Sequence, residues 1–397
     1  MKNRRKYFYW GPFPDEKDGG AVVNYYLIKK QYKIRQDEYY AKCKVPEELN
    51  RDAMPYVAFL GYPEIDKYED IADSMQKRQI PLLNIFHIGP EDFERVIDPV
   101  HEVGGKIVLH QTIHWPDDTC LNSGRLNDFD GIVCPTKYAK RIFMETAGVK
   151  ADILKYIPHA VDVSKYKKER FNPIRDELGI DRYQKVILYT GRLSFWKGVQ
   201  ELIPIMRKLY NEYDCVFIIR GGAFWGNREG RALHKIFSRM SRNNPNVIYM
   251  PEWKPHSYME KLHCISDINV FVSAHEGFGV PLIEAMACEA VPIASALPNQ
   301  LEICGKTGER AILLTPKKQV GVVNEGTPLK VPTSDAIEGA IRWILENPDE
   351  AEVMGRNGRR RVVNSYNLKT IAKTWLEYYD SLVPEDYNMD REAIRNI

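Results

Sequence analysis

The segment SAHEGFGVPLIEAMA, at residues 273–287, points most directly to the fold. It reads as the end of an apolar strand, a turn with two glycines and then a helix. Pro281 suits the start of that helix, where its missing N–H leaves no hydrogen bond unmade. A strand that leads through a tight turn into a helix is typical of α/β proteins with parallel sheets.

The same strand–helix alternation extends along the chain on both sides of this segment. Buried strands are expected at residues 7–10, 56–61, 82–87, 106–114, 131–135, 186–191, 216–221, 247–250, 268–273 and 291–294. Helical patterns such as 200–210 and 281–288 separate them. The pattern predicts parallel sheets covered by helices on both faces. It restarts near residue 185, after a polar stretch at 162–183, which suggests a second domain.

Length and composition agree with a two-domain globular protein. The 397 residues exceed what one ordinary hydrophobic core organises, so two domains are expected. We place the first at residues 1–165 and the second at residues 166–375. The sequence has 44% hydrophobic and 28% charged residues, which is ordinary for a globular chain.

Several classes of protein are excluded by charge and patterning. A formal net charge of only +2 does not suit a nucleic-acid partner. No apolar run approaches the roughly 20 residues of a membrane span, and the first ten residues do not resemble a signal peptide. The seven cysteines are scattered singly, which argues against disulfides and zinc ribbons. We therefore expect a cytoplasmic protein.

The turn at residues 276–280 has the features of an anion site. The backbone amides of Phe278, Gly279 and Val280 lie at the start of a helix, where a diphosphate would be stabilised. Glu276 and Glu284 flank the turn, and a carboxylate accepts hydrogen bonds from neighbouring sugar hydroxyls. Taken alone, the segment fits a helix-capping turn with solvated glutamates better than a binding site.

A second segment, YTGRLSFWKG at residues 189–198, also follows a strand and precedes a helix. Arg192 and Lys197 are placed to clamp a diphosphate without a metal ion, Arg192 in bidentate fashion and Lys197 as a point charge. Two solvated surface cations are the alternative for this segment alone. The two segments together favour a binding site for a nucleoside diphosphate.

Together, these two segments resemble glycosyltransferase family 4. Its E-x7-E motif would be Glu276 and Glu284, and the likeness covers nearly the whole second domain. The resemblance implies a GT-B fold, with two Rossmann-like domains facing across a cleft. It also implies a retaining hexosyltransferase that takes a nucleotide diphosphate sugar, with GDP- or UDP-sugars expected as donors. A glycan or lipid-linked acceptor is expected, and no metal or other cofactor.

The resemblance extends more weakly into the first domain, which would supply the acceptor surface while the second binds the donor. Gly19 and Gly20 resemble the family's glycine-rich loop under the donor phosphate. His114, at the end of an expected strand, would be the catalytic histidine beside donor sugar and acceptor. Residues 157–162, IPHAVD, resemble the linker signature, with His159 and Ala160 in place of the usual Asn and Gly. A C-terminal helix within 376–397 would return to the first domain.

Several other polar residues fit structural roles better than chemical ones. A metal site from His110, His114 and Asp117 is conceivable, because imidazole and carboxylate are good ligands, yet nothing else in the sequence supports it. The Asp128–Asp130 pair is expected to mark the start of a strand. The arginine run 359–361 is expected to lie on a solvated helix face.

Two other functions are compatible with the sequence. A nucleotide-sugar epimerase of the same fold would release an altered sugar without an acceptor. A non-catalytic nucleotide-sugar-binding protein would bind the donor and turn nothing over. The basic and aromatic start of the chain, residues 2–10, permits weak peripheral contact with a membrane.

Overall fold

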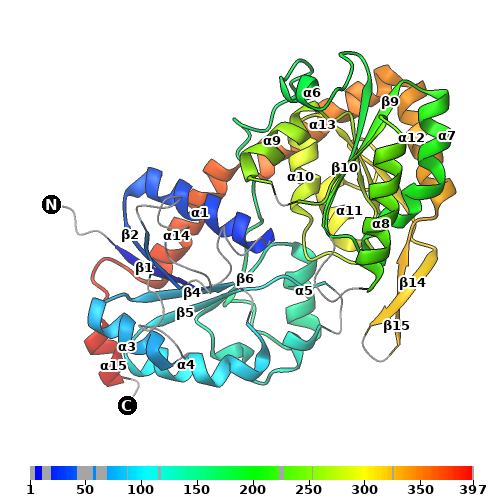
Figure 1. Ribbon diagram of the computed structural model, residues 1–397. Coiled ribbons are helices and arrows are strands. Elements are labelled where there is room, and N and C mark those ends of the chain that lie inside the picture. The colour runs from blue at the N-terminus through cyan, green and yellow to red at the C-terminus, as the bar shows by residue number, and fades with distance from the viewer. Residues whose placement is uncertain are drawn as a thin grey trace. The chain divides into compact units, whose positions relative to one another are not determined.

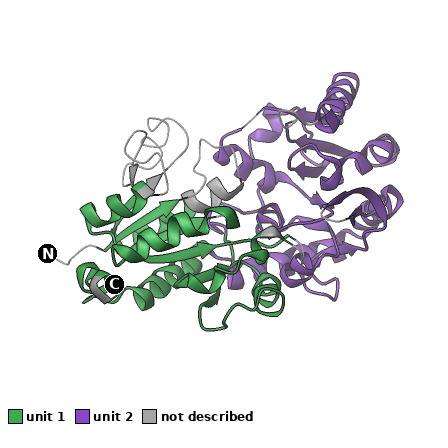
Figure 2. Ribbon diagram, turned by 90° about the horizontal axis from the view of Figure 1, so that it is seen from below, with its two compact units in different colours: residues 1–160, 368–397 green, residues 161–367 purple. Residues whose placement is uncertain are grey.

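The computed structural model describes residues 5–10, 19–42, 57–59, 69–86, 88–114, 118–222, 228–252, 254–323 and 326–395. The chain divides into two compact units (Figure 2). Unit 1 comprises residues 1–160 and 368–397, and unit 2 comprises residues 161–367. The chain passes from one unit to the other after residues 160 and 367, a few residues earlier than the boundaries expected from the sequence, 165 and 375.

Unit 1 is built on a seven-stranded sheet with the order β3-β2-β1-β4-β5-β6-β7. Its strands are β1 (Lys6–Trp10), β2 (Glu38–Lys42), β3 (Val57–Phe59), β4 (Leu82–Phe86), β5 (Lys106–His110), β6 (Gly131–Cys134) and β7 (Leu154–Tyr156). Its helices include α1 (Gly19–Arg35), α3 (Glu69–Arg78), α4 (Phe93–Glu102), α5 (Lys137–Glu145), α14 (Leu368–Leu382) and α15 (Met389–Arg395). Every neighbouring pair of these strands is parallel.

Unit 2 repeats the plan with six parallel strands in the order β10-β9-β8-β11-β12-β13. They are β8 (Lys185–Thr190), β9 (Cys215–Arg220), β10 (Val247–Met250), β11 (Ile268–Phe271), β12 (Val291–Ser295) and β13 (Ile312–Leu314). The helices are α6 (Ile174–Glu177), α7 (Ile203–Glu212), α8 (Arg228–Asn243), α9 (His256–Ile265), α10 (Val280–Ala287), α11 (Pro298–Cys304), α12 (Ser334–Glu346) and α13 (Pro348–Ser365). An antiparallel hairpin, β14 (Lys318–Val323) and β15 (Thr327–Val331), follows β13.

Most expected strands are present, and the differences have a local cause. The strand expected at 106–114 ends at His110, because residues 111–114 leave the ladder. Strands β2, β7 and β13 were not predicted, and β13 has only three residues. β2 (EYYAK) is polar at both ends, and β7 is only three residues long. The hairpin was also missed, and more than half of its residues are exposed.

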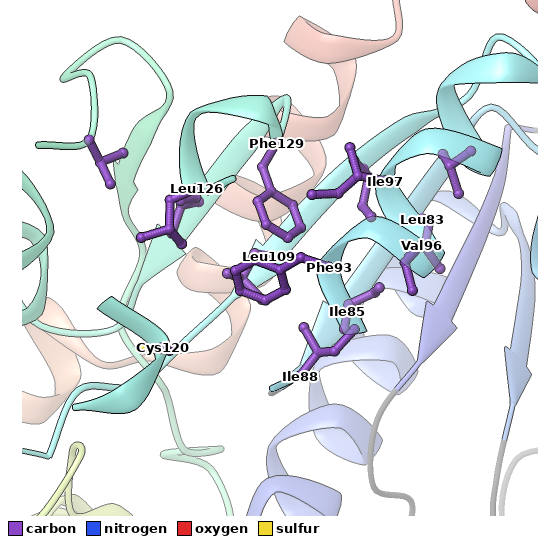
Figure 3. Close-up of a cluster of buried hydrophobic side chains, with 14 of the residues drawn as sticks. Leu83, Ile85, Ile88, Phe93, Val96, Ile97, Leu109, Cys120, Leu126 and Phe129 are labelled. Carbon is purple, nitrogen blue, oxygen red and sulfur yellow. The ribbon is translucent and has the colours of Figure 1, made fainter. Parts of the chain in front are cut away.

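The sheet of unit 1 buries both faces under helices, with α3 and α4 on one side and α1 and α14 on the other (Figure 1). On the first side, Leu83, Ile85 and Leu109 of the sheet meet side chains of α4 (Figure 3). Phe93 of α4 packs edge-on against Phe129, with ring centroids 5.0 Å apart. Each large side chain buried in this way contributes roughly 1.5–3 kcal/mol.

The second face of this sheet is covered by α14, which comes from the C-terminal part of the chain. Its Trp375 and Tyr379 are completely buried against the tyrosines of β1. The hydroxyls of Tyr9 and Tyr379 lie 3.0 Å apart, and Asn84 Nδ2 donates to Tyr379 at 2.5 Å. Because buried hydroxyls need partners, this network fixes α14 on unit 1.

Two simple absences hold for the part of the chain that the structure describes. No helix within the described ranges is long and apolar enough to span a bilayer. The six cysteines in those ranges are all free thiols. Cys43 lies outside them.

Candidate active site

The candidate site of unit 2 lies where the strand order of its sheet reverses. β8 and β11 are adjacent and parallel, with Ile187 opposite Ile268 and Leu188 opposite Asn269. The chain leaves β8 toward β9 on one side, and leaves β11 toward β12 on the other. The loops after β8 and β11 therefore diverge at one edge of the sheet, which is the usual ligand site of open α/β sheets. These loops are the two segments singled out in the sequence.

The loop after β8 is held tightly against the end of β11. It contains a short 3-10 helix, η5 (Phe195–Lys197), followed by Gly198 in the left-handed region with φ 72°. A Cβ at Gly198 would lie 2.5 Å from the carbonyl oxygen of Val272, so glycine is required by both conformation and space. The N–H of Ala274 donates to the carbonyl of Trp196 at 2.7 Å, which joins the two loops directly.

Two predicted site residues meet across this junction. Lys197 forms an ion pair with Oε1 of Glu276. The hydroxyl of Ser273 donates to the same oxygen at 2.7 Å. The side chains of Lys197 and Glu276 are only 15% and 11% exposed, so water screens the pair weakly. The structure thus brings the predicted cation and the predicted carboxylate together in one polar cluster.

An aromatic platform lies beside this cluster and was missed in the sequence. The rings of Trp196 and His275 stack with centroids 4.4 Å apart and an angle of 14°. Lys197 Nζ lies 4.3 Å from the centre of the Trp196 ring, within cation–π range. The exposed Arg192 guanidinium lies 5.8 Å from the same ring. In the sequence, the sign of this platform was the tryptophan directly before Lys197. Its stacking on His275 is visible only in the tertiary structure.

The glycine turn leads into α10 as expected. Gly279 is the N-cap residue with φ 107°, and a Cβ there would lie 3.0 Å from the ring of Phe271. Pro281 occupies the second rather than the first helical position, because α10 begins at Val280. The amides of Val280 and its neighbours at this end are those that a helix leaves without intrahelical partners.

Two buried side chains of α11 hold the carbonyls of this turn. Asn299 Nδ2 donates to the carbonyl of Gly277 at 3.2 Å, and also to that of Glu276. Gln300 Nε2 lies 3.4 Å from the carbonyl of Phe278. Sequence reasoning missed both amides, although they follow a strand at the same sheet edge. Their effect is to fix the backbone of the turn, so its amides keep one direction.

Glu284 has a very different environment from Glu276. It is buried in α10, where Oε1 accepts a 2.5 Å hydrogen bond from Tyr166. His263 Nε2 lies 3.3 Å from Oε2, and His256 Nε2 lies 3.9 Å from Oε1. Burial alone would raise the pKa of Glu284, but His263, His256 and the Tyr166 hydroxyl more than offset it and lower the pKa to about 2. This carboxylate is therefore ionised at neutral pH.

The predicted site residues of unit 1 adjoin segments that lie outside the described ranges. Gly19 and Gly20 form the first residues of α1, after a segment, 11–18, outside the described ranges. His114 lies four residues beyond the end of β5, partly buried, with its backbone N–H 3.5 Å from Asp118 Oδ2. Because β5 ends at His110, His114 lies beyond the strand and not at its end as expected.

His110 has a structural environment instead. It is 1% exposed, among the rings of Phe86 at 4.6 Å, Trp375 at 5.0 Å and His159 at 5.2 Å. Asp117, its suggested co-ligand for a metal, lies outside the described residues. Among the residues that the structure does describe, no group of three or more His, Cys, Asp or Glu side chains is placed to hold a metal ion.

The expectation for the Asp128–Asp130 pair is met. Asp130 contacts Lys106 Nζ at 2.8 Å, the backbone N–H of Ile107 at 2.8 Å and His101 Nε2 at 3.0 Å. Burial tends to raise its pKa, and these contacts together lower it. Asp130 thus ties β5 to the start of β6, a structural role.

The arginine run 359–361 corrects the prediction of a solvated helix face. Arg359 donates to the backbone carbonyl of Tyr166 at 2.7 Å and to that of Ala287. Arg361 donates to the carbonyl of Glu302 at 3.2 Å. Only Arg360 is exposed, since α13 packs against α10 and turns the other two inward.

Comparison with known proteins agrees with this architecture. Residues 171–361 match the family model described as "Glycosyl transferases group 1". An uncharacterized glycosyltransferase of Methanocaldococcus jannaschii is 23% identical over 222 residues, covering 56% of this chain and 51% of that protein. The chain thus matches about half the length of this relative. N-acetyl-alpha-D-glucosaminyl L-malate synthase of Bacillus anthracis is 20% identical over 93% of this chain and 96% of its own.

Among solved structures, HepE of Anabaena in complex with UDP-glucose superimposes with a TM-score of 0.75 at 17% identity, covering 95% of this chain and 99% of that one. Together with the two parallel Rossmann-like sheets, this shows that the chain has the GT-B fold. The fold class predicted from the sequence is confirmed.

Proposed function

We propose that this chain is a retaining glycosyltransferase that transfers a hexose from a nucleoside diphosphate sugar to a hydroxyl acceptor. The observation that carries the proposal is the Lys197–Glu276 cluster, which lies at the switch point of the unit 2 sheet beside the start of α10. A cation, a carboxylate and the amides at the start of a helix, brought to one point, suit a ligand that is anionic at one end and hydroxyl-rich at the other.

In this proposal, unit 2 binds the donor and unit 1 supplies the acceptor surface. Breaking the bond between sugar and phosphate places negative charge on the diphosphate and positive charge on the sugar ring. Arg192, Lys197 and the amides of 278–280 stabilise the leaving diphosphate. Gly19 and Gly20 keep the donor-phosphate role that the family resemblance gives them. Such preorganised donors act most strongly where the charge develops in the transition state.

The two carboxylates receive separate roles. Glu276 faces the transferred sugar. When the donor binds, its diphosphate replaces part of the interaction between Lys197 and Glu276. Glu284 accepts hydrogen bonds from the nucleoside ribose, sharing its oxygens with Tyr166 and His263. His114 lies beside donor sugar and acceptor. The leaving phosphate assists deprotonation of the acceptor on the same face of the sugar, so the anomeric configuration is retained.

The donor and acceptor classes rest on similarity and chemistry. UDP-sugars are favoured because HepE was solved with UDP-glucose, and GDP-sugars remain in the same test. An alpha-galactosylglucosyldiacylglycerol synthase of Streptococcus pneumoniae, 21% identical, suggests a lipid-linked or glycan acceptor. No metal ion is required in this scheme, since Arg192 and Lys197 supply the positive charge.

The proposal is tested by incubating the protein with radiolabelled UDP- and GDP-sugars, with and without an extract of glycans and lipids. Transfer of label to an acceptor is expected. Release of an altered free sugar would instead identify an epimerase, and tight donor binding without turnover a non-catalytic binder. Proton NMR of the first-formed product then reports the anomeric configuration, and an inverted linkage would overturn the retaining assignment.

A further inference from the structure

A cationic hollow lies on α13, in unit 2, and has no part in the proposed reaction. Its cavity of about 510 Å³ is within the usual size range of small-molecule sites. Its lining is entirely polar or charged and comes from α13 and the loop before β13. Arg310, Arg360 and Arg361 supply three guanidinium groups, against the single carboxylate of Glu309.

The charge of the hollow is only partly compensated. Arg310 lies 3.3 Å from Glu309 Oε2, which neutralises one of the three cations. Within the described ranges, neither Arg360 nor Arg361 forms an ion pair with a carboxylate. Placing like charges together costs free energy, so an arrangement of this kind favours an anionic ligand.

The guanidinium of Arg361 is also oriented in advance. It donates to the hydroxyl of Ser365 at 3.0 Å, to the carbonyl of Glu302 at 3.2 Å and to the hydroxyl of Tyr366 at 3.3 Å. These neutral acceptors hold the group in place without removing its charge. A pre-oriented planar guanidinium matches the geometry of phosphate oxygens.

The rest of the lining suits a hydroxylated molecule. Asn357, Arg361 and Asn364 follow one another at helical spacing, so they share one face of α13. Side-chain amides both donate and accept hydrogen bonds, which matches sugar or polyol hydroxyls. We propose that this hollow is a second binding site, separate from the Lys197–Glu276 cluster, for a phosphomonoester of a small hydroxylated molecule such as a hexose phosphate.

The test measures binding of glucose 6-phosphate, inorganic phosphate and glucose by isothermal titration of the full chain, with no donor present. Glucose 6-phosphate should bind, inorganic phosphate more weakly, and glucose not measurably. Arg360→Glu should weaken glucose 6-phosphate binding at least roughly 10- to 100-fold, the range for a lost charged hydrogen bond. Arg360 is exposed, so this variant should fold normally, as a thermal melt will verify.

Two control variants show whether binding takes place in the hollow or elsewhere on the protein. Arg356→Ala, on the same helix but paired with Glu352 outside the hollow, should leave the affinity unchanged. Lys197→Ala should leave it unchanged as well, so the result stands whether or not the proposed glycosyl transfer is correct. Equal binding by Arg360→Glu and the unmodified protein, or loss of binding in Lys197→Ala, would overturn the proposal.

A lipid source of the same phosphomonoester chemistry is distinguished in a separate arm. Vesicles of phosphatidylcholine with and without phosphatidic acid are sedimented with the protein. The proposal expects glucose 6-phosphate binding without selective binding to the phosphatidic acid vesicles. If the protein bound only the phosphatidic acid vesicles, and did so through Arg360, the ligand would be a membrane surface. That outcome would overturn the proposal.

Discussion

The two glutamates of the 276–284 segment show how differently one residue type is used within eight positions. Glu276, in the turn before α10, contacts the ammonium group of Lys197 and the hydroxyl of Ser273. Glu284, in the middle of α10, is enclosed by a tyrosine and two histidines. The first cluster lies where the loops after β8 and β11 diverge. The second is a network in which side chains from α9 and from the segment before α6 surround a buried carboxylate.

The largest expected effect concerns the first cluster. Replacing Lys197 by Ala should lower transfer from the donor roughly 10²- to 10³-fold, the cost of removing one preorganised charge stabiliser. Initial rates at saturating donor measure it. Lys208→Ala is the matched control, because Lys208 is 59% exposed and pairs with Glu338 at the surface. A variant at Lys197 with full activity would remove this residue from the site.

Next in size is the stability carried by Glu284. Its pKa of about 2 in the folded protein is below the ordinary 4.5, so its contribution is fully present above pH 4.5 and is lost as the pH falls toward 2. Glu284→Gln should lower the free energy of unfolding at pH 7 by about 3 kcal/mol, and less at pH 3.5. Urea unfolding at both pH values measures it.

The control for this measurement is Glu309→Gln, at a side chain that is 54% exposed. It should change the free energy of unfolding by less than about 0.5 kcal/mol. A Glu284→Gln deficit that stays constant between pH 7 and pH 3.5 would mean that the interior network does not depend on the ionised carboxylate.

A smaller effect separates the ligand roles of the two carboxylates. Glu284→Gln should weaken nucleoside diphosphate binding roughly 10- to 100-fold, because a charged hydrogen bond contributes about 1.5–3 kcal/mol. Glu276→Gln should leave that affinity nearly unchanged and lower turnover, since its partner is the sugar. Calorimetry with UDP and GDP, on folded protein, tests the split. Equal losses in both variants would show that the sugar and ribose assignments are wrong.

The smallest expected effect is that of metal removal. Since Arg192 and Lys197 provide the charge for the leaving diphosphate, EDTA should leave the transfer rate unchanged. Adding manganese or magnesium after EDTA should not raise it. Activity that EDTA abolished and manganese restored would mean that the cations of the β8 loop do not suffice.

Much of the fold followed from local patterns in the sequence. Apolar runs such as 186–191 and 247–250 form strands because sheets buried on both faces demand continuous apolar residues. The C-terminal helix expected within 376–397 begins earlier in the structure, because α14 spans Leu368–Leu382 and α15 follows at Met389–Arg395. Strand β7 and the β14–β15 hairpin were not predicted, since short or exposed strands carry no such signal.

For the site, the sequence alone determined the residue types in the loops after β8 and β11. It also determined the positions of the glycines that let those loops turn. Only the tertiary structure decided that Lys197 meets Glu276, because that contact depends on β8 and β11 being neighbours in the sheet. The same holds for Tyr166 and His263, which reach Glu284 from distant parts of the chain. Local sequence governs backbone conformation through steric and hydrogen-bond rules that act over a few residues, whereas a carboxylate's partners are fixed by packing between elements far apart in the chain.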